Sequence, residues 1–224
     1  MLEDENQILW LATSNAGLIK LDMKHPKIRN VSVSQTDMPL NYITHDIFAR
    51  RSHEVWAACG VDGVLKVDTK NKVAEHIRVP HRNVYSVYVR RNGEVLFGTT
   101  LGPLRYNPQS EDGVEVIEVT DSIISSLDGR CIVNFINEDW LGNVWFATQV
   151  GLYKYNGIST VRYPSASHGI ENVNVVYADL DGRVWVGTES GSFVMEVGDS
   201  TFVEAKTIDI LPSADNNTTS FADN

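Results

Sequence analysis

Five short apolar segments recur along the chain at intervals of forty to forty-nine residues. Each contains an aliphatic residue, an anchor residue that is usually tryptophan, a second apolar residue, a small residue and usually a threonine. The segments are Ile8–Thr13, Glu54–Cys59, Glu94–Thr99, Asn143–Thr148 and Arg183–Thr188. Their apolar residues do not recur at the three- and four-residue spacing of an amphipathic helix. The pattern therefore predicts an internal repeat that is built from short β-strands.

One copy of the repeat predicts four strands. In the fourth copy, Cys131–Asn137 is apolar and β-branched, and a glycine-containing turn leads to the anchor segment Asn143–Thr148. Two further runs follow, Leu152–Asn156 and Thr160–Tyr163. A period in the forties that is made of short strands is typical of β-propeller blades. The predicted fold class is accordingly all-β, a propeller of about five four-stranded blades.

The repeat also predicts how the chain is organised. Residues 1–208 are expected to form the propeller, and residues 209–224 are expected to be a disordered polar tail with few apolar residues to bury. The five blades are expected around residues 1–33, 41–78, 82–119, 130–163 and 171–206.

Two positions of the repeat have a packing interpretation. The anchor tryptophan would fill the gap between neighbouring blades, which buries up to about 250 Å² of ring. The small residue two positions later would let neighbouring blades approach each other near the propeller axis. In the alternative interpretation the tryptophans are platforms for stacking ligands, but one ring type in one register favours packing.

Composition and charge exclude some classes of function. The chain has 224 residues, 42% of them hydrophobic and 21% charged, and its net charge is −10. Such an acidic surface disfavours binding to nucleic acid and to anionic membranes. No apolar run approaches the ~18 residues of a membrane span, and Met1–Asn6 lacks the basic-then-apolar order of a secretory signal. Direct insertion into a membrane is therefore not expected.

The motif around the anchor resembles the two-component regulator propeller repeat. The pattern Asp-x-x-Gly-Asn-x-Trp-x-(Gly/Ala)-Thr-x-x-Gly-Leu-x-x-Tyr is matched by Asp139–Tyr155 and, less completely, by Asp179–Gly191. The resemblance implies the periplasmic sensor region of a hybrid histidine kinase. In that family two seven-bladed propellers and an immunoglobulin-like domain precede the membrane span. Many members respond to oligosaccharides.

The chain departs from the plan of that family. It carries five copies of the repeat instead of seven, and no kinase, receiver or helix-turn-helix motif. The first copy has only Leu2–Asp4 where a full inner strand is expected. We therefore expect a partial ring, a piece of a longer sensor whose partners include further blades and membrane-linked domains. The alternative is a self-contained five-bladed ring, and a homodimer is compatible with either.

Residues with chemical potential are few. None of the six histidines has metal-ligand spacing, so no metal, cofactor or catalytic residue is predicted. His45–Asp46 either lines the channel as a polar contact or forms hydrogen bonds within an inner strand, and the second interpretation is favoured. His168–Glu171 is more simply a loop, and Arg90–Asn92 a solvated turn. Cys59 and Cys131 are expected to pack as small hydrophobes.

A ligand would bind where the inner strands of the propeller begin. The loops there surround the mouth of the channel, and concave mouths are common ligand sites. Amide, arginine and tyrosine groups suit sugar hydroxyls, which need donors, acceptors and an aromatic face. The candidate binding residues are Asn41, Tyr42, His45, Arg82, Asn83, Arg130, Gln149, Asn172 and Glu189.

Three functions compete at this stage. The first is a non-enzymatic sensor module that binds an oligosaccharide or another small ligand. The second is an enzyme like the streptogramin lyases, which are propellers with similar repeats, but no matching histidine and glutamate set can be transferred from them. The third is a protein-interaction propeller, although no tryptophan here is followed by aspartate and no Gly-Gly doublet occurs.

Overall fold

All of the secondary structure in the described part of the chain is β-strand. The computed structural model describes residues 2–3, 8–12, 18–22, 28–30, 43–51, 53–79, 82–119, 130–163 and 170–205. These residues form five antiparallel sheets of four strands each. We call the sheets β1–β4, β5–β8, β9–β12, β13–β16 and β17–β20 blades 1 to 5.

The strand bounds follow the repeat. In chain order the strands are β1 (Leu2–Glu3), β2 (Ile8–Ala12), β3 (Leu18–Asp22), β4 (Ile28–Asn30), β5 (Asp46–Arg51), β6 (Glu54–Ala58), β7 (Val64–Asp68), β8 (Val73–Ile77), β9 (Val84–Val89), β10 (Val95–Thr99), β11 (Gly102–Tyr106), β12 (Val114–Val116), β13 (Val133–Glu138), β14 (Val144–Thr148), β15 (Gly151–Tyr155), β16 (Thr160–Tyr163), β17 (Val173–Ala178), β18 (Val184–Thr188), β19 (Gly191–Met195) and β20 (Val203–Glu204).

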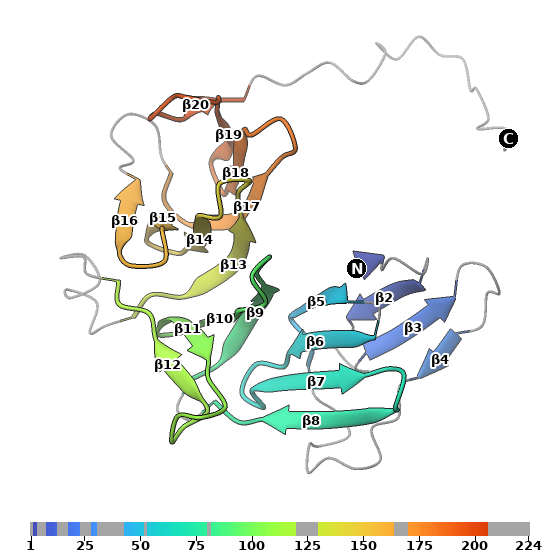
Figure 1. Cartoon of the computed structure of the whole chain (residues 1–224). Coiled ribbons are helices and arrows are strands. Elements are labelled where there is room, and N and C mark those ends of the chain that lie inside the picture. Colours follow the sequence, from blue (N-terminus) through green and yellow to red (C-terminus); the bar gives the residue numbers. More distant parts are fainter. Residues whose placement is uncertain are drawn as a thin grey trace, which may run out of the picture.

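The blades follow one another around an arc (Figure 1). Within each blade the strands pair in chain order, so that every blade is an up-and-down meander. Strand β5 contacts β9, β9 contacts β13 and β13 contacts β17, which places the first strand of each of these blades innermost. The structure is a β-propeller, as the period of the repeat predicted.

The anchor tryptophans pack between blades. Trp56 is 2% exposed and Trp145 is 1% exposed, and both lie in clusters that include residues of the following blade. At the small position of blade 3, a β-carbon on Gly98 would lie 2.8 Å from the carbonyl oxygen of Val133 in blade 4. These contacts agree with the packing interpretation of both positions. Trp185 of blade 5 is only half-buried.

The aspartate of the repeat motif organises the turn between the first two strands of a blade. Asp139 Oδ1 accepts hydrogen bonds from the backbone N–H groups of Leu141 (3.0 Å) and Asn143 (2.9 Å), and Oδ2 accepts one from Trp145 Nε1 (3.0 Å). Asp179 binds Trp185 Nε1 in the same way at 2.9 Å. The spacing from aspartate to tryptophan in the motif therefore reflects one side chain that holds both the turn and the anchor.

The threonine of the motif closes the next turn. Thr148 Oγ1 donates to the carbonyl oxygen of Gly151 (2.7 Å) and accepts from the N–H of Val150 (3.2 Å). Gly151 has a φ of 134°, which disfavours residues with a β-carbon. The threonine and the glycine three residues later thus act together in forming this hairpin.

Candidate functional site

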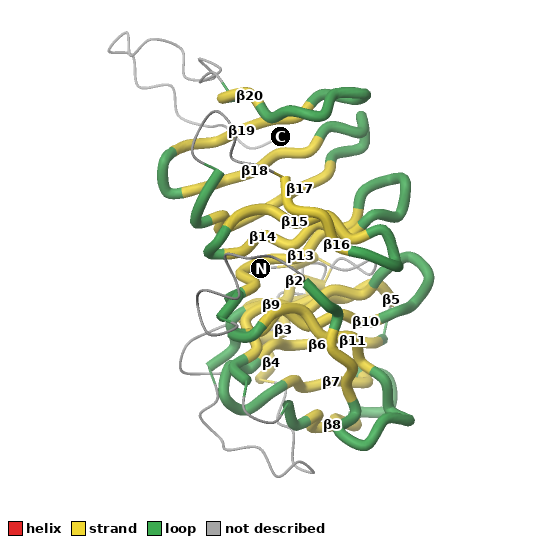
Figure 2. Tube along the Cα trace, turned by 90° about the vertical axis from the view of Figure 1, so that its left-hand side faces the viewer, coloured by secondary structure: helices red, strands yellow, loops and turns green. Residues whose placement is uncertain are grey.

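The loops chosen from the sequence lie at one end of the blades. In blade 2, Asp46 at the start of β5 pairs with Ala58, which pairs with Val64, which pairs with Ile77. The start of the inner strand and the loop after the second strand therefore share one end of the sheet, which we call the mouth end. Figure 2 shows the strands running across the molecule with the loops gathered at its two sides.

Side chains tie successive inner strands together near the mouth end. Asp46 Oδ2 accepts a hydrogen bond from the N–H of Val87 in blade 3 at 3.0 Å. Ser86 Oγ lies 3.5 Å from the carbonyl oxygen of Val133 in blade 4. Asn134 Nδ2 donates to the carbonyl oxygen of Val173 in blade 5 at 2.9 Å. Blades 2 to 5 are thereby connected, and Asp46 acts within this scaffold.

A small polar and aromatic cluster stands beside this scaffold. The exposed His45 ring meets the Tyr85 ring edge-on, with 5.1 Å between the ring centroids. Asn83 Nδ2 lies 3.5 Å from the Tyr85 hydroxyl. Partial burial lowers the pKa of His45, which favours the neutral imidazole. We call His45, Asn83 and Tyr85 the His45 cluster, and Tyr85 is a member that the sequence analysis did not select.

The two candidate arginines lie near one loop of blade 3. Arg82 Nη1 donates to the carbonyl oxygen of Leu101 at 3.0 Å, and burial lowers the pKa of its guanidinium. Arg130 is exposed and precedes Cys131, which forms an isolated bridge with Leu101. Both residues therefore flank the mouth end between blades 3 and 4.

Three further candidates meet between blades 4 and 5. The N–H of Asn172 donates to the carbonyl oxygen of Gln149 at 3.2 Å. Asn172 Nδ2 lies 3.5 Å from Glu189 Oε2, and its backbone has a φ of 48°. The structure thus brings Gln149, Asn172 and Glu189 together. The remaining candidates, Asn41 and Tyr42, lie outside the described residues, as does His168.

The carboxyl group of Asp46 is held in a desolvated position. Burial raises its pKa from 3.8 to about 6, although hydrogen bonds from the N–H groups of Val87 and Ile47 act in the opposite direction. Between about pH 4 and pH 6, Asp46 is therefore protonated in the folded chain and ionised in the unfolded chain. Stability contributed by this group falls as the pH rises through that window.

We expect the variant Asp46→Asn to remove this dependence. Relative to the wild type, it should gain about 3 kcal/mol of unfolding free energy between pH 4 and pH 7, since one pKa unit corresponds to about 1.4 kcal/mol. Urea unfolding of both proteins at several pH values measures the difference. A difference that stays constant with pH would contradict the raised pKa.

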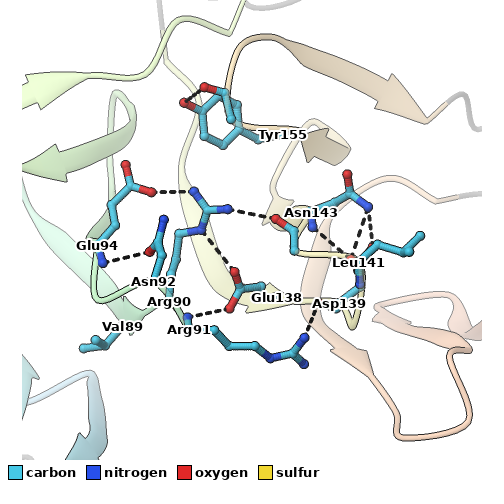
Figure 3. A network of polar contacts seen from close by, with 12 residues as sticks. Val89, Arg90, Arg91, Asn92, Glu94, Glu138, Asp139, Leu141, Asn143 and Tyr155 are labelled. Atoms are coloured by element: carbon cyan, nitrogen blue, oxygen red, sulfur yellow. Dashed lines mark hydrogen bonds and ion pairs between the residues drawn. The ribbon is translucent and has the colours of Figure 1, made fainter.

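The opposite end of blades 3 and 4 carries a charged network (Figure 3). Arg90 is 8% exposed, and it pairs with Glu94, donates to Glu138 Oε1 (3.2 Å) and donates to the carbonyl oxygen of Gly142 (2.8 Å). Glu138 Oε2 also accepts from the N–H of Arg91 at 2.8 Å. The prediction that Arg90 lies in a solvated turn was therefore wrong, because its partner Glu138 comes from another blade. These groups satisfy each other and tie the blades together.

Two depressions lie on the outer parts of the blades. One of about 640 Å³ is on blade 2, where Lys66 pairs with Glu54 at 3.7 Å and the ammonium lies 5.1 Å from the Trp56 ring. Another of about 200 Å³ lies between blades 4 and 5 and includes Trp140 and Tyr163. In the first of these, Lys66 and Glu54 are already partners of each other.

No metal site is evident in the described part of the chain. It contains no group of three or more His, Cys, Asp or Glu side chains that could hold a metal ion. Cys59 and Cys131 are buried and form no disulfide, in agreement with their expected packing, and burial raises the pKa of Cys59 to about 12. Among the described residues no helix has the length and apolar character to cross a membrane.

Comparison with known proteins gives matches only at the level of structure. No model of a known protein family matches the chain, and no curated protein matches it. The extracellular domain of BT3049 from B. thetaiotaomicron, described as a hybrid two component system, is similar with a TM-score of 0.64 at 16% identity, over 85% of this chain and 25% of that one. The extracellular domain of the two component system BT4673 from the same organism gives a TM-score of 0.69 at 19% identity, over 86% and 26%.

An enzyme has the same fold. Virginiamycin B lyase from Staphylococcus aureus gives a TM-score of 0.72 at 14% identity, over 92% of this chain and 68% of that one. This chain spans about a quarter of the length of the two extracellular domains. At these identities the likeness shows a β-propeller, a fold that extracellular domains of two component systems and a lyase both use.

Proposed function

We propose that this propeller is the ligand-sensing part of a periplasmic two-component signalling protein and that it binds an oligosaccharide at the mouth end. The observation that carries the proposal is the His45 cluster. It combines an aromatic ring, a ring nitrogen and an amide on two neighbouring blades, and such groups can supply the donors, acceptors and aromatic contact that suit a sugar ring. The likeness to extracellular domains of two-component systems supports the same function.

The arrangement of the site suits an extended ligand. The His45 cluster lies on blades 2 and 3, Arg82 and Arg130 flank blades 3 and 4, and Gln149, Asn172 and Glu189 lie on blades 4 and 5. A chain of several sugar units can contact more than one of these groups, whereas a monosaccharide reaches one. Signalling would require that the ligand binds one conformation of the sensor more tightly than the other.

A thermal melt against a panel of plant and host oligosaccharides tests the proposal. We expect one glycan to stabilise the protein by about 2.7 kcal/mol at a hundredfold excess over Kd. Tyr85→Ala should weaken that binding by about tenfold or more, since it removes the aromatic face. Ile158→Ala, at the opposite end of blade 4 and 92% exposed, is the control and should bind as the wild type does. A panel without any stabilising glycan would contradict the proposal.

The second candidate function is that of an enzyme like virginiamycin B lyase. One observation favours it, the likeness to that lyase over 92% of this chain. Two described histidines lie at the mouth end of blade 2: the ring of His45 contacts Tyr85, and His76 Nε2 contacts the carbonyl oxygen of Asp62 at 2.5 Å. The neighbouring Asp46 carboxylate binds backbone N–H groups instead. Incubation with quinupristin, the compound named with that lyase, distinguishes the two functions: turnover that is lost in His45→Ala would replace the sensor proposal.

A further inference from the structure

Arginine side chains elsewhere in the blades are paired with carboxylates. Three of them each contact two acidic side chains: Arg90 with Glu94 and Glu138 (Figure 3), Arg105 with Glu94 and Glu115, and Arg183 with Asp179 and Asp181. The chain has 29 Asp and Glu residues against 19 Lys and Arg residues, so carboxylates are in excess. In such a chain an arginine at a structural position readily finds an acidic partner.

The two arginines of the mouth end are different. Among the described residues neither Arg82 nor Arg130 forms an ion pair. Arg82 is half-buried and donates to the carbonyl oxygen of Leu101 at 3.0 Å. Burial lowers the pKa of its guanidinium, and no described carboxylate acts in the opposite direction. A partly desolvated cation without an anionic partner is unfavourable, so the position of Arg82 calls for an explanation beyond stability.

Both arginines stand beside one loop of blade 3. The N–H of Thr100 donates to the carbonyl oxygen of Asn83, the residue after the first arginine, at 3.1 Å. The carbonyl oxygen of Thr100 accepts from the N–H of Cys131, the residue after the second arginine, at 3.2 Å. Leu101 of the same loop is 38% exposed and forms a bridge with Cys131. The backbone thus brings the two arginines to the two sides of a single partly exposed leucine.

The groups around this loop suit a sugar unit that carries a negative charge. A guanidinium has five N–H donors in a planar fork that matches a carboxylate or a sulfate group, and Arg82 uses Nη1 in its bond to Leu101. The N–H of Gln149 donates at 3.1 Å to the carbonyl oxygen of Ile132, which places an amide side chain on the adjoining loop of blade 4. The amide can bind hydroxyl groups, and the leucine can contact the C–H groups of a sugar ring.

Acidic side chains of the mouth end belong to other blades. Asp62 follows β6 of blade 2, and Glu189 follows β18 of blade 5, where it lies 3.5 Å from Asn172 Nδ2. The Asp46 carboxyl group is bound to the N–H of Val87. The net charge of −10 repels an anion at long range, but salt at 0.1 M screens exposed charges beyond about 10 Å. A direct contact with two guanidinium groups is screened much less.

From these observations we propose that the ligand of the mouth end is an acidic oligosaccharide, and that Arg82 and Arg130 bind the anionic group of one of its sugar units. The inference rests on the proposed function and names the ligand class of the same site. The charged group is a carboxylate in a uronic acid and a sulfate in a sulfated sugar. Both present oxygen atoms to the fork of a guanidinium, so the experiment treats them as separate arms.

Thermal melts with pairs of glycans test the ligand class. Oligogalacturonate and a glucuronate-containing oligosaccharide, each with its methyl ester, form the carboxylate arm. Oligosaccharides of a sulfated galactan, with their desulfated form, make up the sulfate arm. We expect an acidic member to stabilise the wild type at a concentration at least about tenfold lower than its neutral derivative, since hydrogen bonds to charged groups are the stronger ones. A neutral glycan that binds as tightly as its acidic counterpart would overturn this inference and leave the proposed function standing. A panel without any stabilising glycan would overturn both.

Two variants and a control test the residues. Arg130→Gln removes a charge from an exposed side chain, and Arg82→Gln removes the half-buried one. Each should bind the acidic glycan about tenfold more weakly or worse, while binding of the neutral derivative stays the same. Lys70→Gln removes the same charge from an exposed residue in the turn between β7 and β8, at the opposite end of blade 2, and should bind as the wild type does. Melts without ligand show that each variant is folded. Folded Arg82 and Arg130 variants that bind the acidic glycan as the wild type does would overturn the inference.

Discussion

Replacing Asp139 by alanine should lower the free energy of unfolding by about 4 kcal/mol, because the buried indole N–H of Trp145 and the partly buried N–H groups of the turn lose their acceptor, at about 1–3 kcal/mol for a buried donor. Asp139 is 5% exposed, and it alone accepts from the indole of Trp145, which is 1% exposed, and from the turn amides of Leu141 and Asn143. Such a loss corresponds to a fall of roughly 10 °C in melting temperature for a domain of this size. Urea and thermal unfolding followed by tryptophan fluorescence measure it.

Asp179→Ala provides the matched comparison in blade 5. Asp179 accepts from Trp185 Nε1 and from the N–H and Nε of Arg183, but the side chains around it are partly open to solvent. Water can replace the lost acceptor there, so we expect a loss of about 1 kcal/mol. Equal losses for the two variants would show that the burial of Asp139 and Trp145 in blade 4 does not set the size of the effect.

Gly98→Ala should also destabilise the propeller, by about 3 kcal/mol. A β-carbon there would lie 2.1 Å from Ser86 Oγ and 2.8 Å from the carbonyl oxygen of Val133. The serine can rotate away, but the carbonyl belongs to the inner strand of the next blade, so blades 3 and 4 must separate. Urea unfolding gives the loss in stability, and a crystal structure of the variant should show the displaced strand.

Gly187→Ala tests the cause of that effect, because Gly187 occupies the same position in blade 5. A β-carbon there would lie 2.8 Å from Val175 Cγ1, a side chain that is 42% exposed and free to rotate. We expect a change of at most about 0.5 kcal/mol. If both variants lost stability equally, the cost would come from the backbone of the glycine and not from the approach of the next blade.

The periodic features of the fold could be predicted from the sequence. The expected strand Thr160–Tyr163 is observed as β16 without change, and β13 begins two residues later than the predicted strand at Cys131. Burial of Trp56 and Trp145 was also predicted, because one ring recurs in one register. The local alternation of apolar and polar residues and the residues of the turns determine such features. Both signals recur in each copy of the motif.

Contacts between blades could not be predicted, because they join residues that are about one repeat apart. Arg90 was expected in solvent, but Glu138 of the next blade holds it in a buried network. Tyr85 was not selected, since its role depends on His45 of the preceding blade. The two residues of each pair are forty or more positions apart in the sequence. No short-range pattern of charge or hydrophobicity indicates which residues at that separation will meet.

The sequence by itself determined the fold class, the repeat and the acidic surface, because a two-residue alternation and a recurring motif are local properties of the chain. The tertiary structure decided which polar groups meet at the mouth end and which side chains neighbouring blades bury. Gly98 and Gly187 show the physical reason: they share one position in the repeat, yet a neighbouring carbonyl crowds the first, whereas an exposed side chain lies beside the second. Burial depends on what packs against a strand, and this is a property of the assembled blades.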